Sequence, residues 1–153
     1  MEANNGSLRG FKQMLYEGGI RTPWIVSWPA KFPGGRSIDT PVISFDILPT
    51  VLDALEIEVD RAFDGKSLLP LIEGAAQTHH AALHWDIAGP RKEWAVRQRD
   101  WKLFSSRGKQ GLYHLGKDPS EATDVIDLNP AKAKELLELH KKWKRDVEAS
   151  AGK

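Results

Sequence analysis

The sequence contains no cysteine among its 153 residues. Disulfide bonds, thiolate metal sites and cysteine nucleophiles are therefore excluded. Net charge is also nearly absent, because 22 Lys and Arg residues face 21 Asp and Glu residues, for a formal charge of +1. A chain without a strong overall charge has no long-range field that would steer it to nucleic acid or to a membrane surface. Recognition of an anion must then come from a local site.

Long apolar runs are missing as well. No stretch approaches the roughly 20 apolar residues that are needed to span a bilayer, and the first six residues are polar, without the pattern of a secretory signal peptide. We therefore expect neither nucleic acid nor a membrane as a partner. With 41% hydrophobic residues, the chain is predicted to form one compact domain, or one domain plus part of another.

The first half of the chain has few regular patterns. Residues 1–23 are polar and rich in glycine, which predicts a loop. Residues 24–28 are a short run of aromatic and β-branched residues before a proline, which predicts a strand covered on both faces. In residues 44–55 the apolar residues share one helical face, which predicts a helix that Ser44 or Asp46 could cap.

The second half changes to the pattern of an antiparallel sheet. Four short segments rich in aromatic or β-branched residues are separated by turn residues, at 81–85, 93–97, 101–105 and 112–115. Asn129 and Pro130 then suit the start of a helix, in which apolar residues recur at spacings of three and four up to Val147. We predict an α+β chain with a small antiparallel sheet of about four strands packed on a C-terminal helix.

Residues 5–23 carry the most specific signal, the string NGSLRGFKQMLYEGGIRTP. This string resembles the second signature of the type I sulfatases, approximately N-G-x-L-R-G-x-K-x-x-x-Y-E-G-G-I-R-V-P. Other family motifs are matched in the same order along the chain, by residues 44–53, 64–71, 95–103 and 112–121. One departure is Arg99, which stands where the family commonly has a turn glycine. The resemblance extends from residue 4 to residue 147.

The resemblance implies the C-terminal part of an alkaline-phosphatase-like α/β fold. Residues 1–75 would be the tail of the large sulfatase domain, and residues 76–153 its small C-terminal subdomain. In the family, a calcium ion and a formylglycine nucleophile, made from Cys or Ser in a C/S-x-P-x-R motif, take part in hydrolysis. The corresponding residues lie upstream in the family and are absent here. We therefore expect this chain alone to bind no metal or cofactor and to be inactive.

The resemblance also implies roles for individual residues. Lys12 matches the family's sulfate-contacting lysine and is our candidate for a catalytic and substrate-binding residue, because a compact ammonium group suits sulfuryl oxygens. Arg9 and His84 are further candidates for substrate contact. Two other pairs would support the loop that carries Lys12. Glu17 and Arg21 would fix it by an ion pair or by hydrogen bonds, and Gly18 and Gly19 would permit a backbone turn that other residues cannot make.

A metal site is not expected from the sequence. His79 and His80 are adjacent, and two adjacent side chains seldom point at one ion; no third ligand is evident from the sequence. Asp46 and Asp53 are better explained as helix-surface and capping residues than as calcium ligands.

Two functional interpretations follow from the resemblance. In the first, the chain is the C-terminal fragment of an exported sulfatase that hydrolyses sulfate monoesters of carbohydrates, and its partners are a sulfated small molecule or glycan and the missing N-terminal sulfatase domain. In the second, it is a non-catalytic module that binds sulfated glycans. A parent that hydrolyses a phosphate or phosphonate ester is a further possibility, because the wider superfamily hydrolyses all three.

Overall fold

The computed structural model describes residues 4–32, 34–87, 90 and 92–151 of the chain. They fall into two compact units: Met1–Pro23 with Ala82–Lys153, which we call the sheet unit, and Trp24–Ala81, which we call the α2 unit. The two units do not coincide with the division predicted at residues 75 and 76. That division concerns the domains of a longer sulfatase and stays a prediction. Among the described helices, none is sufficiently long and apolar to cross a bilayer.

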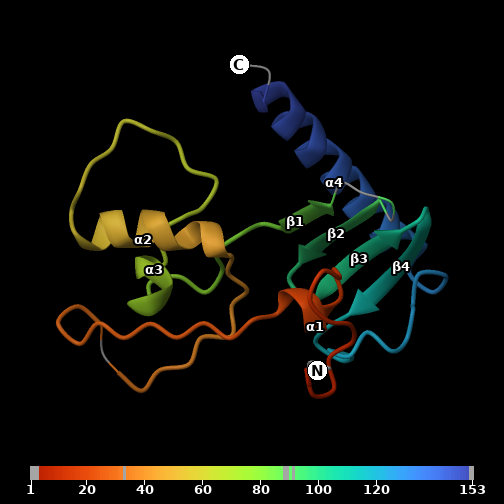
Figure 1. Cartoon of the computed structure of the whole chain (residues 1–153), viewed down its shortest axis with the longest axis horizontal. Helices are drawn as coiled ribbons and strands as arrows, with labels where there is room; N and C mark the ends of the chain where they lie inside the picture. Colours follow the sequence, from red (N-terminus) through yellow and green to blue (C-terminus); the bar gives the residue numbers. More distant parts are fainter. Residues whose placement is uncertain (1–3, 33, 88–89, 91, 152–153) are drawn as a thin grey trace. The chain divides into compact units, whose positions relative to one another are not determined.

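The sheet unit is built on a four-stranded antiparallel sheet in which consecutive strands are neighbours (Figure 1). The strands are β1 (Leu83–Ile87), β2 (Glu93–Gln98), β3 (Trp101–Ser106) and β4 (Lys109–His114). Each strand overlaps a segment that the alternating pattern predicts, although β4 begins three residues earlier. Together with α4 (Pro130–Ala151), which begins at the predicted proline, the sheet confirms the predicted α+β class.

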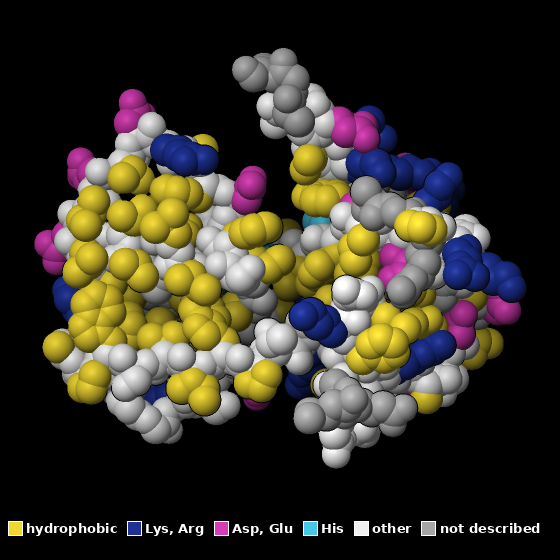
Figure 2. All heavy atoms as spheres, in the orientation of Figure 1, with side chains coloured by type: hydrophobic (Ala, Val, Ile, Leu, Met, Phe, Trp, Pro, Cys, Tyr) yellow, Lys and Arg dark blue, Asp and Glu magenta, His cyan; other side chains and the backbone are white. Residues whose placement is uncertain are grey.

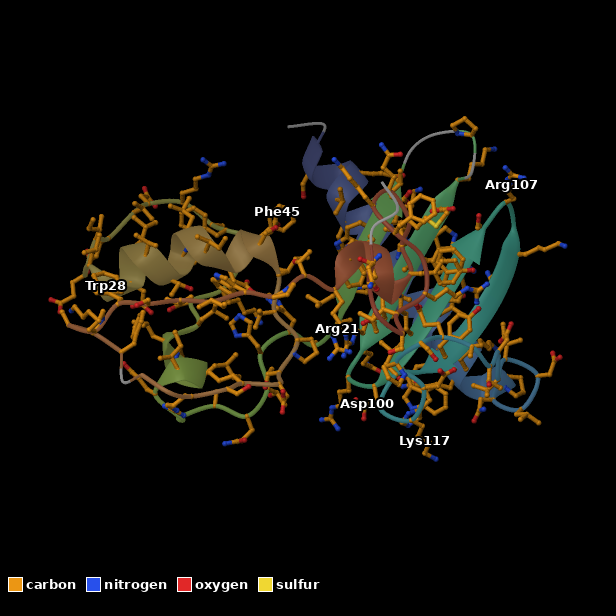
Figure 3. All side chains as sticks on the ribbon, turned by 60° about the horizontal axis from the view of Figure 1, so that its bottom comes forward. Arg21, Trp28, Phe45, Asp100, Arg107 and Lys117 are labelled. Atoms are coloured by element: carbon orange, nitrogen blue, oxygen red, sulfur yellow. The ribbon has the colours of Figure 1, made fainter. Side chains whose placement is uncertain are left out.

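The turns explain one departure from the family pattern. Arg99, in the tight turn between β2 and β3, has a φ of 54° and so adopts the left-handed conformation that glycine favours. The backbone N–H of Leu115 donates to the carbonyl oxygen of Asp100 at 2.7 Å, which ties this turn to the end of β4. Figure 3 shows Asp100 and Lys117 at this end of the sheet, and Arg107, in the β3–β4 turn, at the other.

The sheet is covered on both faces. On one face it packs against α4, and the buried residues of this core are Val96, Leu103, Leu112, Ala133 and Leu136. On the other face it packs against the N-terminal segment with its short helix α1 (Glu17–Ile20), through Leu15, Ala95, Phe104, Tyr113 and Leu115. Side chains alternate along a strand, so the neighbours Ala95 and Val96 enter opposite cores. The N-terminal segment predicted to be a loop thus includes one turn of helix.

The α2 unit contains little regular structure. Its elements are η1 (Ser44–Asp46), α2 (Ile47–Ala54) and α3 (Leu69–Ile72). The first two confirm the helix predicted for residues 44–55. However, the predicted apolar face is largely exposed, with Leu48 at 53%, whereas Thr50 and Ala54 are buried. Figure 2 shows a broad field of apolar side chains over this unit, where Phe45, Ile47 and Val51 are also exposed.

The strand predicted for residues 24–28 is wrong for this chain. The segment carries no strand assignment and pairs with no other described segment. Ile25 is 89% exposed, so neither a partner strand nor a covering layer is present among the described residues. A β-branched and aromatic composition favours a strand, but a strand exists only where another strand satisfies its backbone groups.

Candidate functional site

The loop that carries Lys12 is closed by two glycines. The N–H of Gly18 donates to the carbonyl oxygen of Arg9 at 2.7 Å, so the two ends of the loop are in contact. A Cβ added to Gly18 would lie 2.4 Å from the Gly10 oxygen, and one added to Gly19 would lie 2.1 Å from the Met14 oxygen. Neither glycine has a positive φ. The reason for these glycines is therefore close backbone approach, not the special turn expected from the sequence.

Glu17, near the C-terminal end of this loop, belongs to a buried cluster of charged side chains on the sheet. We define the clamp as Glu17, Arg97, Lys102 and Glu121. The Lys102 Nζ atom lies 2.9 Å from Glu17 Oε1 and 2.8 Å from Glu121 Oε1, and the Arg97 Nη1 atom lies 3.3 Å from Glu17 Oε2. The Glu17 N–H also donates to Glu121 Oε2 at 2.6 Å. The clamp thus joins α1 to β2, to β3 and to the turn at residue 121.

The electrostatics of the clamp depend on its burial. The side chains of Lys102 and Glu121 are both 0% exposed and that of Glu17 is 1% exposed. Burial raises the pKa of Glu121 above its usual range, and the nearby Lys102 ammonium opposes that rise. A buried charge without a partner is costly, so each member of the clamp depends on the others. This dependence fixes the base of the loop to the sheet.

Arg9 is also used to hold the loop. Its Nη1 atom donates to the Glu121 carbonyl oxygen at 2.9 Å and to the Tyr113 hydroxyl oxygen at 3.3 Å. Its guanidinium group lies over the Tyr16 ring, 4.1 Å from the centroid. These contacts occupy donors and one face of the guanidinium group that a substrate would otherwise use. The geometry favours a supporting role for Arg9 over the substrate contact expected from the resemblance.

Lys12 lies at the exposed tip of the same loop. It stands between Gly10 and Gln13, whose φ values of 80° and 76° turn the chain sharply on both sides. Within the described part of the chain, its ammonium group makes neither a hydrogen bond nor an ion pair. Arg21 is similarly exposed and is marked in Figure 3. Its backbone N–H donates to the Glu17 oxygen at 2.8 Å, but Glu17 pairs with Lys102 and Arg97 instead of with the Arg21 side chain.

His84 is placed apart from this loop, beside α4. Its ring stacks on Trp143 at 4.9 Å with an interplanar angle of 5°. Burial, and then the neighbouring His140, lower the pKa of His84 to about 4. The imidazole is therefore neutral at pH 7 and offers a sulfate no positive charge. No contact links His84 to Lys12 among the described residues. His84 instead packs against Trp143 of α4.

The adjacent histidines do not diverge as the sequence led us to expect. His79 and His80 both point at the buried Asp46 carboxylate, which supplies the third group that the sequence did not reveal. Asp46 stands at the N-cap position of α2 but its side chain makes no capping hydrogen bond there. Its carboxylate oxygens instead accept the N–H groups of Ile43 and Lys66, each at 2.9 Å.

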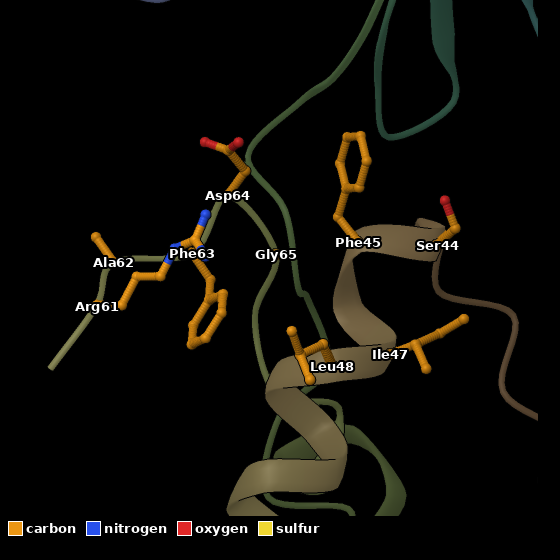
Figure 4. A pocket seen from close by; sticks show the side chains of 9 residues that line it. All are labelled: Ser44, Phe45, Ile47, Leu48, Arg61, Ala62, Phe63, Asp64 and Gly65. Carbon is orange, nitrogen blue, oxygen red and sulfur yellow. The ribbon is translucent and has the colours of Figure 1, made fainter. Parts of the chain in front are cut away.

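A pocket in the α2 unit opens beside the start of α2 (Figure 4). Phe45 and Leu48 line it from the helical side, and Arg61, Phe63 and Asp64 line it from the loop that follows. None of the residues predicted to contact substrate lines this pocket. We therefore do not assign it to the site predicted from the sequence.

Sequence reasoning missed three members of the clamp: Arg97, Lys102 and Glu121. All three lie in motifs that resemble the sulfatase family, in residues 95–103 and 112–121. That resemblance was the available signal, but it assigns no partner to any of them. Arg97 and Lys102 lie 80 and 85 positions after Glu17. A local sequence pattern cannot predict contacts between residues so far apart.

With this geometry in place, comparison with known proteins identifies the family. Residues 9–149 match the family model described as N-sulphoglucosamine sulphohydrolase, C-terminal. The chain belongs to this family. Human arylsulfatase D is 45% identical to this sulfatase chain over 140 residues, which are 82% of the chain and 24% of the relative. Mouse steryl-sulfatase is 37% identical over 109 residues, 68% of the chain and 18% of the relative.

A bacterial relative and two solved structures agree with this assignment. The arylsulfatase of Clostridium perfringens is 31% identical over 137 residues, 86% of the chain and 28% of the relative. A structure from a study of glycosaminoglycan metabolism by Bacteroides thetaiotaomicron has a TM-score of 0.76 and 24% identity, covering 91% of the chain and 32% of that protein. Another, solved with its substrate D-glucosamine-2-N,6-O-disulfate, has a TM-score of 0.59 and 23% identity, covering 68% and 24%.

These matches define what the chain represents. It spans between about a sixth and a third of the relatives' lengths, and it corresponds to a C-terminal portion of a sulfatase. The structural likenesses establish the fold, since their sequence identities are below 25%. The predicted relation to sulfatases of alkaline-phosphatase-like fold is thereby confirmed.

Proposed function

We propose that this chain works as the C-terminal part of a sulfatase that hydrolyses sulfate monoesters of carbohydrates, and that it contributes Lys12 to the sulfate site. The observation that carries the proposal is the contrast within one loop. Lys12 is exposed and unpaired among the described residues, whereas Glu17, five residues later, is anchored in the buried clamp. A charged side chain on a fixed base suits the recognition of an anion.

The chemistry of sulfate ester hydrolysis explains why a fixed cation is useful. Negative charge spreads over the sulfuryl oxygens and grows on the leaving oxygen in the transition state, so a preorganised ammonium group stabilises that state. In this proposal, the N-terminal sulfatase domain holds the formylglycine nucleophile and a calcium ion, which would supply the attacking group and further positive charge. The role left to Lys12 is to bind and orient the sulfate group.

The surface of the α2 unit supports the need for another domain. Several apolar residues of this unit are 40% exposed or more, among them Ile47, Leu48, Val51 and Leu55. Exposed apolar surface that is contiguous and larger than a few hundred Å² usually marks an interaction surface. In this proposal the N-terminal sulfatase domain covers these residues.

The test is a substitution in the longer sulfatase that contains this chain. We expect Lys12→Ala to lower kcat/KM for an aryl sulfate by about 10²- to 10³-fold, the effect of removing one preorganised charge-stabilising group. Lys117→Ala, which removes another exposed lysine of the sheet unit, is the matched control and should change kcat/KM less than twofold. Equal activities of the Lys12→Ala and Lys117→Ala proteins would refute the role of Lys12. Calcium-dependent turnover by this chain alone would refute its dependence on a second domain.

A non-catalytic glycan-binding module is the second candidate. It is favoured by the presence of two exposed cations at one loop, Lys12 and Arg21, whose side chains have no partner among the described residues. Calorimetry with heparin-like and carrageenan-like oligosaccharides tests it on the isolated chain. Micromolar binding that weakens at least tenfold in Lys12→Ala would support this function, and absence of binding across both series would exclude it.

A further inference from the structure

Three side chains of the α2 unit converge on one point although they are far apart in the sequence. Asp46 lies where η1 meets α2, and His79 and His80 lie 33 and 34 residues later, near the end of the unit. The Asp46 side chain is fully buried, and the two histidine side chains are 6% and 11% exposed. The two histidine side chains are therefore the members of this group that retain some exposure to solvent.

The three side chains lie close enough together to hold one metal ion. The His79 Nε2 atom lies 3.3 Å from Asp46 Oδ2, and the His80 Nε2 atom lies 2.9 Å from Asp46 Oδ1. One ligand atom from each of the three residues falls within 4.8 Å of the other two. Zinc bonds of about 2.0–2.2 Å to nitrogen and oxygen place neighbouring ligand atoms of a tetrahedral site about 3.3–3.6 Å apart.

The two histidines do not stand in the same relation to the carboxylate. His80 Nε2 is within hydrogen-bonding distance of both Asp46 oxygens, at 2.9 and 3.0 Å. His79 Nε2 approaches Asp46 without the alignment of a hydrogen bond, and it is a buried nitrogen with no hydrogen-bond partner in the described part of the chain. A buried polar atom without a partner requires an explanation, and coordination of a metal ion would provide one.

The His79 and His80 rings lie edge to face. Their centroids are 4.4 Å apart and their planes are inclined at 76°. This edge-to-face arrangement lets two adjacent residues present Nε2 to the same carboxylate. The obstacle expected from their adjacency, that the two side chains would diverge, is therefore absent.

The backbone around the cluster fixes the proposed anionic ligand in place. The Asp46 carboxylate accepts the N–H groups of Ile43 and Lys66, each at 2.9 Å. The same two N–H groups hold the carboxylate in a fixed orientation, as hydrogen bonds behind a metal ligand commonly do.

We propose that Asp46, His79 and His80 form a binding site for a divalent transition-metal ion of the zinc class. Two imidazoles and one carboxylate, with no thiolate, are a ligand set that zinc, cobalt and nickel accept. Three protein ligands leave a fourth position for water. The ion would link residues 79 and 80 to Asp46 at the start of α2. This link would stabilise the α2 unit, which has little regular structure of its own. This role is separate from the calcium ion of sulfate hydrolysis and does not depend on the function of Lys12.

Cobalt is the probe for this site, because a low-symmetry cobalt centre absorbs visible light. The chain, freed of any histidine tag and of metal, is titrated with Co²⁺. We expect one Co²⁺ per chain, with a visible absorption that one equivalent of Zn²⁺ abolishes. His79→Gln and His80→Gln should each weaken binding by at least tenfold, because each removes one ligand while keeping a polar side chain of similar reach. Asp46 is left intact, since its carboxylate also holds two backbone N–H groups.

His114→Gln is the matched control. His114 is a partly buried histidine of the sheet unit, packed against the Trp101 ring, and the proposal gives it no role. This variant should bind Co²⁺ as the original chain does. Absence of saturable binding, weak binding at many places, or unchanged affinity in both His79→Gln and His80→Gln would overturn the proposal.

A measurement on the unaltered chain guards against loss of folding in the variants. Paramagnetic Co²⁺ shifts and broadens the NMR signals of the histidines that bind it. We expect this effect at His79 and His80 and not at His114 or His140. Effects at His114 or His140 without effects at His79 and His80 would refute the assignment, whatever the variants do.

Discussion

The two units of the chain treat their apolar residues in opposite ways. In the sheet unit, both faces of the sheet are covered and Val96, Leu103 and Leu112 are 0% exposed. In the α2 unit, Ile47, Leu48 and Val51 follow an equally regular pattern but remain exposed. The difference teaches that an apolar pattern predicts which face of an element will be buried, and says nothing of whether the covering partner belongs to the same chain. Four predictions examine this comparison, beginning with the largest effect.

The largest effect is expected inside the sheet unit, at Lys102. Lys102→Ala leaves two buried carboxylates facing each other, so the free energy of unfolding should fall by about 3–5 kcal/mol. Urea unfolding followed by tryptophan fluorescence measures this. The control is Lys141→Ala, which removes an exposed ion pair with Glu138 and should cost less than about 1 kcal/mol. Similar losses in the two variants would contradict the picture of an interdependent clamp.

The second prediction concerns how the stability of the sheet unit depends on pH, because His84 is packed in this unit. The folded pKa of His84 is about 4, below its usual value, so the unfolded chain binds more protons as the pH falls from about 6.5 to 4. Stability should be fully present above that window and should decrease within it, by up to about 3 kcal/mol. The lowered pKa of His140 acts in the same direction.

Urea midpoints measured from pH 7 to pH 4 test this prediction. His84→Phe keeps an aromatic ring against Trp143 without a titrating group, so its midpoints should change less with pH. An equal slope in the variant and in the unaltered chain would show that His84 is not the titrating group responsible.

Gly19→Ala tests whether the Lys12 loop depends on close backbone contact. The new Cβ would meet the Met14 oxygen at 2.1 Å, and the backbone cannot move away as a flexible side chain could. We expect a loss of about 1–3 kcal/mol in the free energy of unfolding, together with faster hydrogen exchange in residues 9–18. Gly34→Ala is the control, because a Cβ there meets nothing within 4 Å. Unchanged exchange in Gly19→Ala would contradict the packing explanation.

The smallest effect is expected on the exposed face of α2. Leu48→Gln should change the stability of this chain by no more than about 0.5 kcal/mol, as at other exposed positions. For comparison, truncation of a leucine in the buried core, Leu136→Ala, should lower the free energy of unfolding by about 2–5 kcal/mol. In the longer sulfatase we expect Leu48→Gln to become clearly destabilising, which thermal unfolding of both proteins would reveal. Equal effects in the two proteins would contradict the proposed covering of α2.

The elements that could be predicted share one property: the information about them is local. The alternation of Trp94 with Val96 and the spacing from Leu136 to Trp143 each report one inward face, and the structure contains the strand and the helix. The same spacing does not show that Val147, at the end of this stripe, is 46% exposed. The strand at residues 24–28 failed because its existence requires a partner that no local pattern contains. The loop motif could be recognised from residues 5–23, but the reason for Gly18 and Gly19 became visible only in the backbone oxygens beside them.

The sequence by itself determined the family, the order of the sheet elements and the position of the lysine loop, because these depend on short strings and on periods of two and 3.6 residues. Only the tertiary structure decided which charges meet. Glu17 finds Lys102 and Glu121, and Asp46 finds His79 and His80, across separations of 33 to 104 positions. Charged side chains are free of any periodic rule, so their pairing is set by how the backbone brings distant segments together, and by the high cost of burying a charge alone.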